Sequence, residues 1–152
     1  MSDHFLDTSA LVKHYHVEIG TPKIDLLWAT PTARLFISRL GLVETVSVFA
    51  KKVRSGAITT GDFALLRRRF FADLRRRRPV IIRLLVRHCQ EADRLLEQHG
   101  LVHSLHTLDA IQLAVALDLH EKGLLTELVS SDRTLLAVAS LQGLAVVNPE
   151  VP

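Results

Sequence analysis

Four acidic side chains of this sequence stand where carboxylates could do chemistry together. Asp7 follows a short apolar run and precedes two hydroxyl residues, the second of which is Ser9, and Asp132 follows another apolar run. Asp109 opens a long apolar stretch, and Glu44 lies among apolar and small neighbours. Carboxylates that gather closely repel one another and raise one another's pKa values unless a cation lies among them. Because all-oxygen ligands suit Mg²⁺ or Mn²⁺ better than zinc, the set predicts a hard divalent metal.

Each acid taken alone also has an ordinary structural explanation. Asp7 and Asp132 could simply cap the helices that follow them. Asp109 could lie in a first helical turn, where its negative charge interacts favourably with the helix dipole. Glu44 could pair with an arginine, because a charge among apolar neighbours is costly unless it is paired or binds a metal. The residues one by one leave both interpretations open, and the elements that position them must decide.

Apolar runs and helical periodicities alternate along the chain. This alternation predicts a parallel sheet with helices on both faces. Functional sites in such sheets form beyond the carboxyl ends of the strands, so Asp7 and Asp132 are expected at the same edge. Strands are expected at 3–7, 34–38, 125–130 and 144–147, with 80–86 either a strand or the start of a helix. Helices are expected at 9–15, 21–28, 60–78, 89–100, 108–119 and 133–141, and one more carries Leu42, Val46, Phe49 and Val53 and ends at Gly56.

The bulk composition is that of a folded protein. The chain has 152 residues, an apolar fraction of 48% and a mean hydropathy of +0.23, which excludes disorder and predicts one domain over residues 1–152. A single cysteine, Cys89, excludes an intrachain disulfide, favours a reducing compartment and is expected to be buried. The histidines show no zinc-ligand spacing. With neither a signal peptide nor a run of about 20 apolar residues, a cytoplasmic protein is expected.

A block of arginines gives the chain an uneven charge. Residues 67–87 hold nine arginines and one acid, or +8, whereas the rest of the chain holds ten basic and fifteen acidic residues, or −5. The predicted helix there has an apolar stripe that contains Phe70, and four arginines fall roughly opposite it: Arg68, Arg69, Arg75 and Arg76. Such a face is often merely solvated. The density of one sign nevertheless favours an anionic partner, either nucleic acid or an acidic segment of another protein.

Four blocks of the sequence resemble a known family. The blocks LDTSALVKHY, SRLGLVETVSVFAKKVRSG, HTLDAIQLAVAL and LVSSDRTLLAVA occur in order over nearly the whole chain and resemble PIN-domain ribonucleases, most closely VapC-type toxins of type II toxin–antitoxin pairs. The resemblance implies a PIN-like α/β/α sandwich with a central, mainly parallel sheet. It also implies metal-dependent cleavage of RNA, a homodimer, and a small antitoxin protein that blocks the site.

The resemblance assigns roles to the residues singled out above. The family's acidic quartet corresponds to Asp7, Glu44, Asp109 and Asp132, which would hold Mg²⁺, or Mn²⁺, and catalyse hydrolysis. Asp7 and Asp109 would bind the metal most directly, and Ser9 would orient a ligand or a water. The four arginines would bind RNA or the antitoxin. The chain departs from the family pattern at His106, where another basic residue is common, and at Gln112, where histidine is frequent, and both departures are expected to affect RNA contacts.

Three other functions remain open at this stage. The chain could be a housekeeping RNA-processing nuclease with no antitoxin, or a binding module for RNA or protein that has the fold without the activity. A receiver or phosphatase domain of similar layering is the third alternative. Such domains use adjacent acids after a strand, whereas the segment LDTSA contains only one, and this counts against the third alternative.

Overall fold

A single parallel sheet forms the centre of the molecule. The computed structural model describes all residues from Met1 to Pro152, and its five strands pair in the order β3-β2-β1-β4-β5, every pair parallel. This order confirms the predicted α/β class and the mainly parallel sheet. The strands are β1 (Ser2–Leu6), β2 (Ala33–Ser38), β3 (Val80–Ile82), β4 (Glu127–Val129) and β5 (Val146–Val147).

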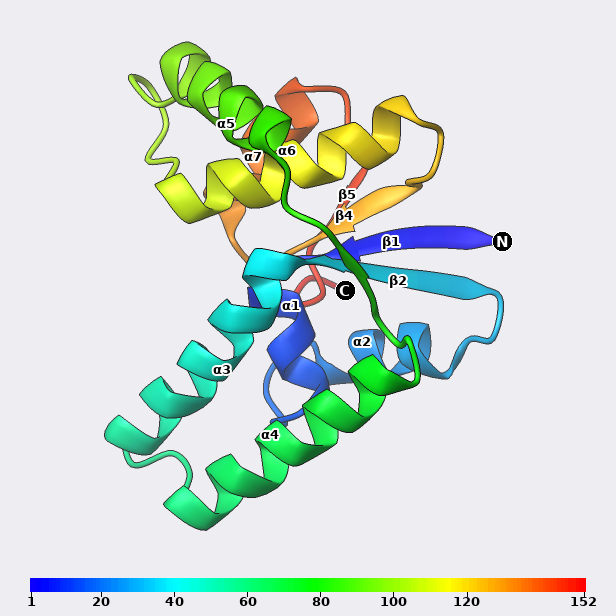
Figure 1. Ribbon diagram of the computed structural model, residues 1–152, viewed down its shortest axis with the longest axis vertical. Helices are drawn as coiled ribbons and strands as arrows, with labels where there is room; N and C mark the ends of the chain where they lie inside the picture. The colour runs from blue at the N-terminus through cyan, green and yellow to red at the C-terminus, as the bar shows by residue number, and fades with distance from the viewer.

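Helices cover both faces of the sheet and complete the predicted sandwich (Figure 1). Successive strand residues point to opposite faces, and so Phe5 packs in one hydrophobic core while Leu6 packs in the other. One face carries α1 (Thr8–Leu11), the 3-10 helix η1 (Val12–His14), α2 (Thr21–Ala29), α3 (Arg39–Arg54) and α4 (Thr60–Arg75). The other carries α5 (Val86–His99), α6 (Thr107–Glu121) and α7 (Arg133–Leu141). None of these helices is long and apolar enough to cross a membrane.

The predicted elements differ from the structure at several points. The helix expected at 9–15 is a short α-helix that tightens into η1, and segment 80–86 contains both alternatives, a strand to Ile82 and the first residue of α5. Cys89 is exposed, so its predicted burial is wrong. The most buried positions of α3 are Gly41, Thr45 and Phe49, so only one of the predicted stripe residues lies fully in the core.

One arginine of the basic block belongs to the fold. Arg78 donates hydrogen bonds to backbone carbonyl oxygens from the last turn of α2 to the start of β2, including that of Leu27 at 3.0 Å from Nη2 and that of Ala33 at 3.1 Å from Nη1. Trp28 and Thr30 accept further bonds from the same guanidinium. Arg78 therefore ties the corner between α4 and β3 to the start of β2, and backbone carbonyl oxygens accept the hydrogen bonds of its guanidinium.

Candidate active site

The four predicted acids come from four separate segments and line one open pocket. Asp7 ends β1 and Asp132 follows β4, two neighbouring strands whose carboxyl ends meet at one edge of the sheet. Glu44 lies on α3, directly after β2, and Asp109 lies in the first turn of α6. The pocket has a volume of about 490 Å³, and Ser9 lines it as well. Its other lining residues are Thr8, Ser47, Val48, Lys51 and Leu108.

Asp7 is buried and hydrogen-bonded through one oxygen. Its Oδ2 accepts from Ser9 Oγ at 2.7 Å, from Ser9 N at 3.3 Å and from Ser130 Oγ at 3.0 Å, whereas Oδ1 has no hydrogen-bond partner. Asp7 is the N-cap of α1, which confirms the structural role that the sequence left open for it. Burial raises the pKa of Asp7, and the hydrogen bonds from Ser9 and Ser130 act in the opposite direction. Capping uses one carboxylate oxygen and leaves the other free.

Glu44 has no cationic partner. Its Oε2 accepts hydrogen bonds from Thr8 Oγ1 and from Gln112 Nε2, both at 2.8 Å, and its Oε1 has no hydrogen-bond partner. The alternative that Glu44 forms an ion pair with an arginine is wrong. Neutral donors alone hold this carboxylate, so no positively charged partner offsets it at the pocket.

The remaining two acids repeat the pattern of one engaged oxygen. Asp132 Oδ1 accepts from Leu135 N at 2.9 Å as the N-cap of α7, and its Oδ2 has no partner. Asp109 Oδ2 lies 3.5 Å from His106 Nδ1, and its Oδ1 has no partner. All four acids therefore keep one oxygen available to a ligand in the pocket.

The electrostatics of Asp109 show that the acids act on one another. Burial, then the negative charges of Asp7 and Asp132, and to a lesser degree that of Glu44, raise the pKa of Asp109 to about 6, against a lowering by His106. Like charges that destabilise each other's ionised forms are the condition that a bound cation relieves. Lys51 is the only basic residue that lines the pocket, and it forms no ion pair.

The chemistry of the pocket suits a hard divalent cation. The available donors are carboxylate and hydroxyl oxygens, which Mg²⁺ and Mn²⁺ prefer. No three histidine, cysteine, aspartate or glutamate side chains of the protein are placed so that together they could hold a metal ion. The acids thus surround the pocket without converging on one point.

Sequence reasoning missed three neighbours of the quartet. Thr8 holds Glu44 and Ser130 holds Asp7, and Ser130 follows β4 directly, at the sheet edge where Asp7 and Asp132 were expected to meet. Lys51 could have been found, since it lies seven residues after Glu44, two helical turns along the same face of α3. Gln112 is 0% exposed and its amide faces Glu44, so any effect of this residue on RNA contacts would be indirect.

The four predicted arginines are exposed but do not form one group. Arg68 and Arg75 line a shallow pocket together with Arg67, whose guanidinium lies 4.6 Å from the ring centre of Phe71. Arg69 lies over the ring of Tyr15 at 5.9 Å, and Arg76 pairs with Asp73 at 3.7 Å. The arginines free of acidic partners on α4 are therefore Arg67, Arg68, Arg69 and Arg75, and Arg67 was not predicted.

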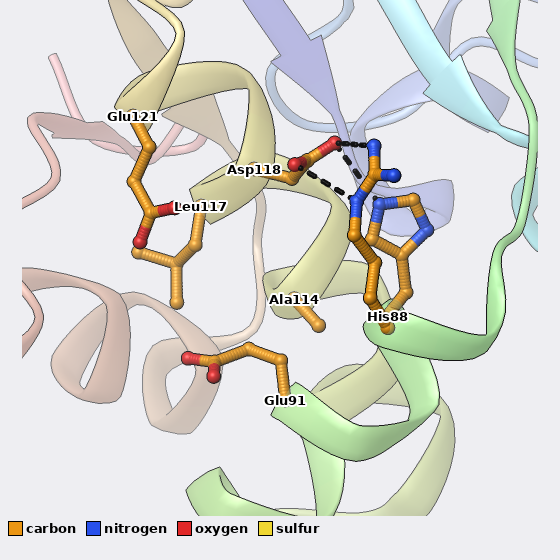
Figure 2. A pocket seen from close by; sticks show the side chains of 7 residues that line it. His88, Glu91, Ala114, Leu117, Asp118 and Glu121 are labelled. Carbon is orange, nitrogen blue, oxygen red and sulfur yellow. Dashed lines mark hydrogen bonds and ion pairs between the residues drawn. The ribbon is translucent and has the colours of Figure 1, made fainter.

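A second pocket, between α5 and α6, contains a histidine–aspartate pair (Figure 2). His88 Nε2 lies 3.1 Å from Asp118 Oδ2, and His88 Nδ1 accepts from the backbone N–H of Leu85 at 3.0 Å, so both ring nitrogens are in use. Asp118 also accepts from Arg87 and Lys122. Burial opposes ionisation of Asp118, but the three donors lower its pKa below the ordinary value. This network fixes the start of α5 to α6 and has no free nucleophile or base.

The parallel sheet and the acid-lined pocket define a protein of the PIN class, and comparison of the sequence bears this out. The PIN domain family model matches residues 4–141, so the chain belongs to the PIN-domain family. Among curated proteins, no sequence matches the chain.

Solved structures with the same fold include VapC toxins. VapC20 from Mycobacterium tuberculosis, described as a sarcin–ricin loop cleaving toxin, has 18% identity and a TM-score of 0.64 over 97% of this chain and 98% of its own. PAE2754 from Pyrobaculum aerophilum has 20% identity and a TM-score of 0.66 over 98% and 85%. VapBC2 from Rickettsia felis, bound to a DNA fragment from its promoter, has 18% identity and a TM-score of 0.62 over 96% and 98%. These likenesses show that the chain shares the fold of these proteins.

Proposed function

We propose that this protein is a metal-dependent endoribonuclease and the toxin of a toxin–antitoxin pair. The observation that carries the proposal is the pocket in which four carboxylates from distant segments each present an oxygen without a hydrogen-bond partner. Membership of the PIN-domain family supports it, and so does the shared fold with a toxin described as cleaving the sarcin–ricin loop. A binding module would have no need for unpaired carboxylates that destabilise one another.

The residues fit a magnesium ion. Mg²⁺ keeps several waters and uses one or two carboxylates, so it does not need a cage in which every acid converges. Asp7 and Asp109 would bind it most directly, and Glu44 and Asp132 would act directly or through water. Mn²⁺ would fit the same oxygen donors. When bound, such an ion supplies positive charge that stabilises the attacked phosphate and lowers the pKa of water.

The chain itself supplies orientation and a phosphate contact. Ser9 donates to Asp7 Oδ2 and accepts from the backbone N–H of Ser131 at 2.9 Å, and it thereby fixes which oxygen of Asp7 faces the pocket. One acid of the quartet accepts the proton of the attacking water. Lys51, which lines the pocket and is free of acidic partners, would contact the phosphate next to the scissile bond.

The partners follow from the same assignment. VapBC2 from Rickettsia felis and a toxin–antitoxin complex from Klebsiella pneumoniae share this fold, with 18% and 21% identity, and a small antitoxin is accordingly proposed here. The free arginines of α4 would bind the RNA backbone or an acidic segment of that antitoxin. The protein is proposed to act as a homodimer, and its substrate is RNA.

Cleavage of a mixed cellular RNA pool by purified protein tests the proposal. The reaction is run with Mg²⁺, with Mn²⁺ and with EDTA, beside the variant Asp7→Asn, which keeps the shape of the side chain and removes its charge. Discrete fragments that require metal and Asp7 are expected. Folded Asp7→Asn protein that cuts at the rate of the unaltered protein, or cleavage that persists in EDTA, would contradict it.

A further inference from the structure

The carboxylate of Glu44 is held by an uncharged pair of donors. Gln112 lies on α6, three residues after Asp109, and its Nε2 donates to Glu44 Oε2 at 2.8 Å. Thr8, the residue after Asp7, donates to the same Oε2 at 2.8 Å. Two hydrogen bonds from two different elements therefore converge on one oxygen of Glu44, while the other oxygen has no partner.

The side chain of Gln112 is itself fixed in orientation. Its Oε1 accepts from Ser38 Oγ at 2.6 Å, and Ser38 Oγ accepts from the backbone N–H of Gly41 at 2.9 Å. Since a carboxylate only accepts hydrogen bonds, the amide nitrogen faces Glu44, and the amide oxygen is left to accept from the hydroxyl of Ser38. Ser38 and Gln112 are both 0% exposed, so water does not compete for these bonds.

The packing around this amide leaves little freedom. A Cβ atom at Gly41 would lie 3.2 Å from Gln112 Nε2 and 3.6 Å from Ser38 Oγ, closer than most side-chain contacts in the first case. The glycine thus lets α3 approach α6 at the level of Glu44. A chain of hydrogen bonds runs from the N-cap of α3 through Gln112 to the acid on the same helix.

We propose that Gln112 and Thr8 are positioning residues that hold Glu44 Oε2 and direct Oε1 into the pocket for the metal or its water shell. This inference rests on the proposed metal-dependent nuclease function. An amide and a hydroxyl suit this task because they donate hydrogen bonds without adding charge. A lysine or arginine in their place would hold Glu44 equally well but would offset the negative charge that attracts the cation.

The variants Thr8→Val and Gln112→Met remove the donors while keeping side-chain size. Binding of Mn²⁺ to each folded variant is measured by electron paramagnetic resonance, and RNA cleavage is measured at saturating Mn²⁺. Loss of a hydrogen bond to a metal ligand typically lowers metal affinity or activity by about 10–100-fold. We expect the Kd for Mn²⁺ to rise by about that factor and kcat to fall, with KM for RNA nearly unchanged, and we expect Thr8→Ser to restore both.

Thr45→Val is the matched control. Thr45 is also a buried threonine, and it is next to Glu44 in sequence, but its hydroxyl donates to the carbonyl oxygen of Gly41 at 2.7 Å. Its Kd for Mn²⁺ is expected to stay within about threefold of the unaltered protein.

The outcomes separate this inference from the proposed function. If the unaltered protein binds Mn²⁺ through Asp7 but Thr8→Val and Gln112→Met bind it equally well, the positioning role is overturned and the proposed function stands. If no Asp7-dependent Mn²⁺ binding occurs at all, the proposed function fails first. Variants that lose their fold, without recovery of Mn²⁺ affinity in Thr8→Ser, would show a purely structural role and would also overturn the inference.

Discussion

The two ends of α6 place aspartates in opposite surroundings. Near its start, Asp109 lies beside a pocket lined by three other carboxylates, and their charges, after burial, raise its pKa to about 6. Near its end, Asp118 accepts hydrogen bonds from His88 (Figure 2), from Arg87 and from Lys122, and its pKa is lowered. The same residue type on the same helix thus lies mainly among like charges at one end, with His106 acting against them, and among positively charged donors at the other.

The difference indicates a structural role for Asp118 and a functional role for Asp109. A carboxylate that is matched by cations stabilises the fold and has no oxygen to offer a ligand. A carboxylate among others of its kind is destabilising in the absence of a counter-charge, and strongly perturbed groups of this sort are concentrated at functional sites. The pocket that contains the histidine–aspartate pair resembles a catalytic arrangement more closely, but it belongs to the fold.

The largest expected effect comes from neutralising each aspartate in turn. Asp109→Asn removes a presumed metal ligand, and RNA cleavage is expected to fall by about 100-fold or more, beyond the loss typical of residues that merely orient a ligand. Asp118→Asn is expected to leave the rate per folded molecule within about threefold. Initial rates of cleavage of one defined RNA, with folding checked by circular dichroism, measure both. Equal losses in the two variants would remove the distinction between the two ends.

The free energy of unfolding is expected to rise in Asp109→Asn and to fall in Asp118→Asn. At pH 7, Asp109→Asn relieves repulsion and should raise the free energy of unfolding by roughly 1–3 kcal/mol, as a pKa raised from 3.8 to about 6 implies for a mostly buried group. Asp118→Asn weakens charge-assisted hydrogen bonds and should lower it by about 1–2 kcal/mol. Urea denaturation without added metal measures both. A loss of stability in Asp109→Asn would contradict the account.

The pH dependence of stability sharpens the same contrast. Folded Asp109 binds its proton more tightly than the unfolded chain does, so its contribution to the free energy of unfolding falls as pH rises from about 4 to 6. Folded Asp118 binds its proton less tightly, so its stabilising contribution is present above pH 4 and is lost as pH falls below that value. Subtracting the urea-denaturation profile of each asparagine variant from that of the unaltered protein isolates each slope. Slopes of equal sign would refute this assignment.

Lys51 offers a smaller effect on substrate binding. Lys51→Gln removes the only cation that lines the acid pocket, so KM for RNA is expected to rise by up to about fivefold, as loss of a solvent-exposed ion pair of at most about 1 kcal/mol implies. Arg54→Gln, at the exposed end of the same helix, is the control and should change KM little. An unchanged KM in Lys51→Gln would show that this lysine is only a solvated side chain.

The smallest effects are expected on α4. If its free arginines bind RNA, Arg68→Gln and Arg75→Gln should each reduce the slope of log affinity against log salt by about 0.7, the value for one phosphate of a single strand. Arg76→Gln should change it less, because Asp73 already pairs with Arg76. Binding of a single-stranded RNA at several salt concentrations, measured by fluorescence anisotropy, gives these slopes. Unchanged slopes in all three variants would favour the antitoxin as partner of this face.

The sequence predicted the frame of the site because that frame follows from topology. Alternating strands and helices imply a parallel sheet, and the acids after β1 and β4 meet at its carboxyl edge. The hydrogen-bond partners of Glu44 could not be predicted from the sequence, since Thr8 and Gln112 lie 36 and 68 positions away from it. The role of Arg78 could not be predicted either. Its guanidinium donates to carbonyl oxygens that are distant in sequence, although the residue lies in a run of exposed arginines.

Anomalous diffraction from a crystal grown with Mn²⁺ at pH 7 would locate the metal site of this protein. We expect a manganese peak in the pocket of the quartet, next to the free oxygens of Asp7 and Asp109, and no peak at Asp118. A peak beside Asp118, or an empty quartet pocket at millimolar Mn²⁺, would contradict the assignment of this pocket as the metal site of a nuclease.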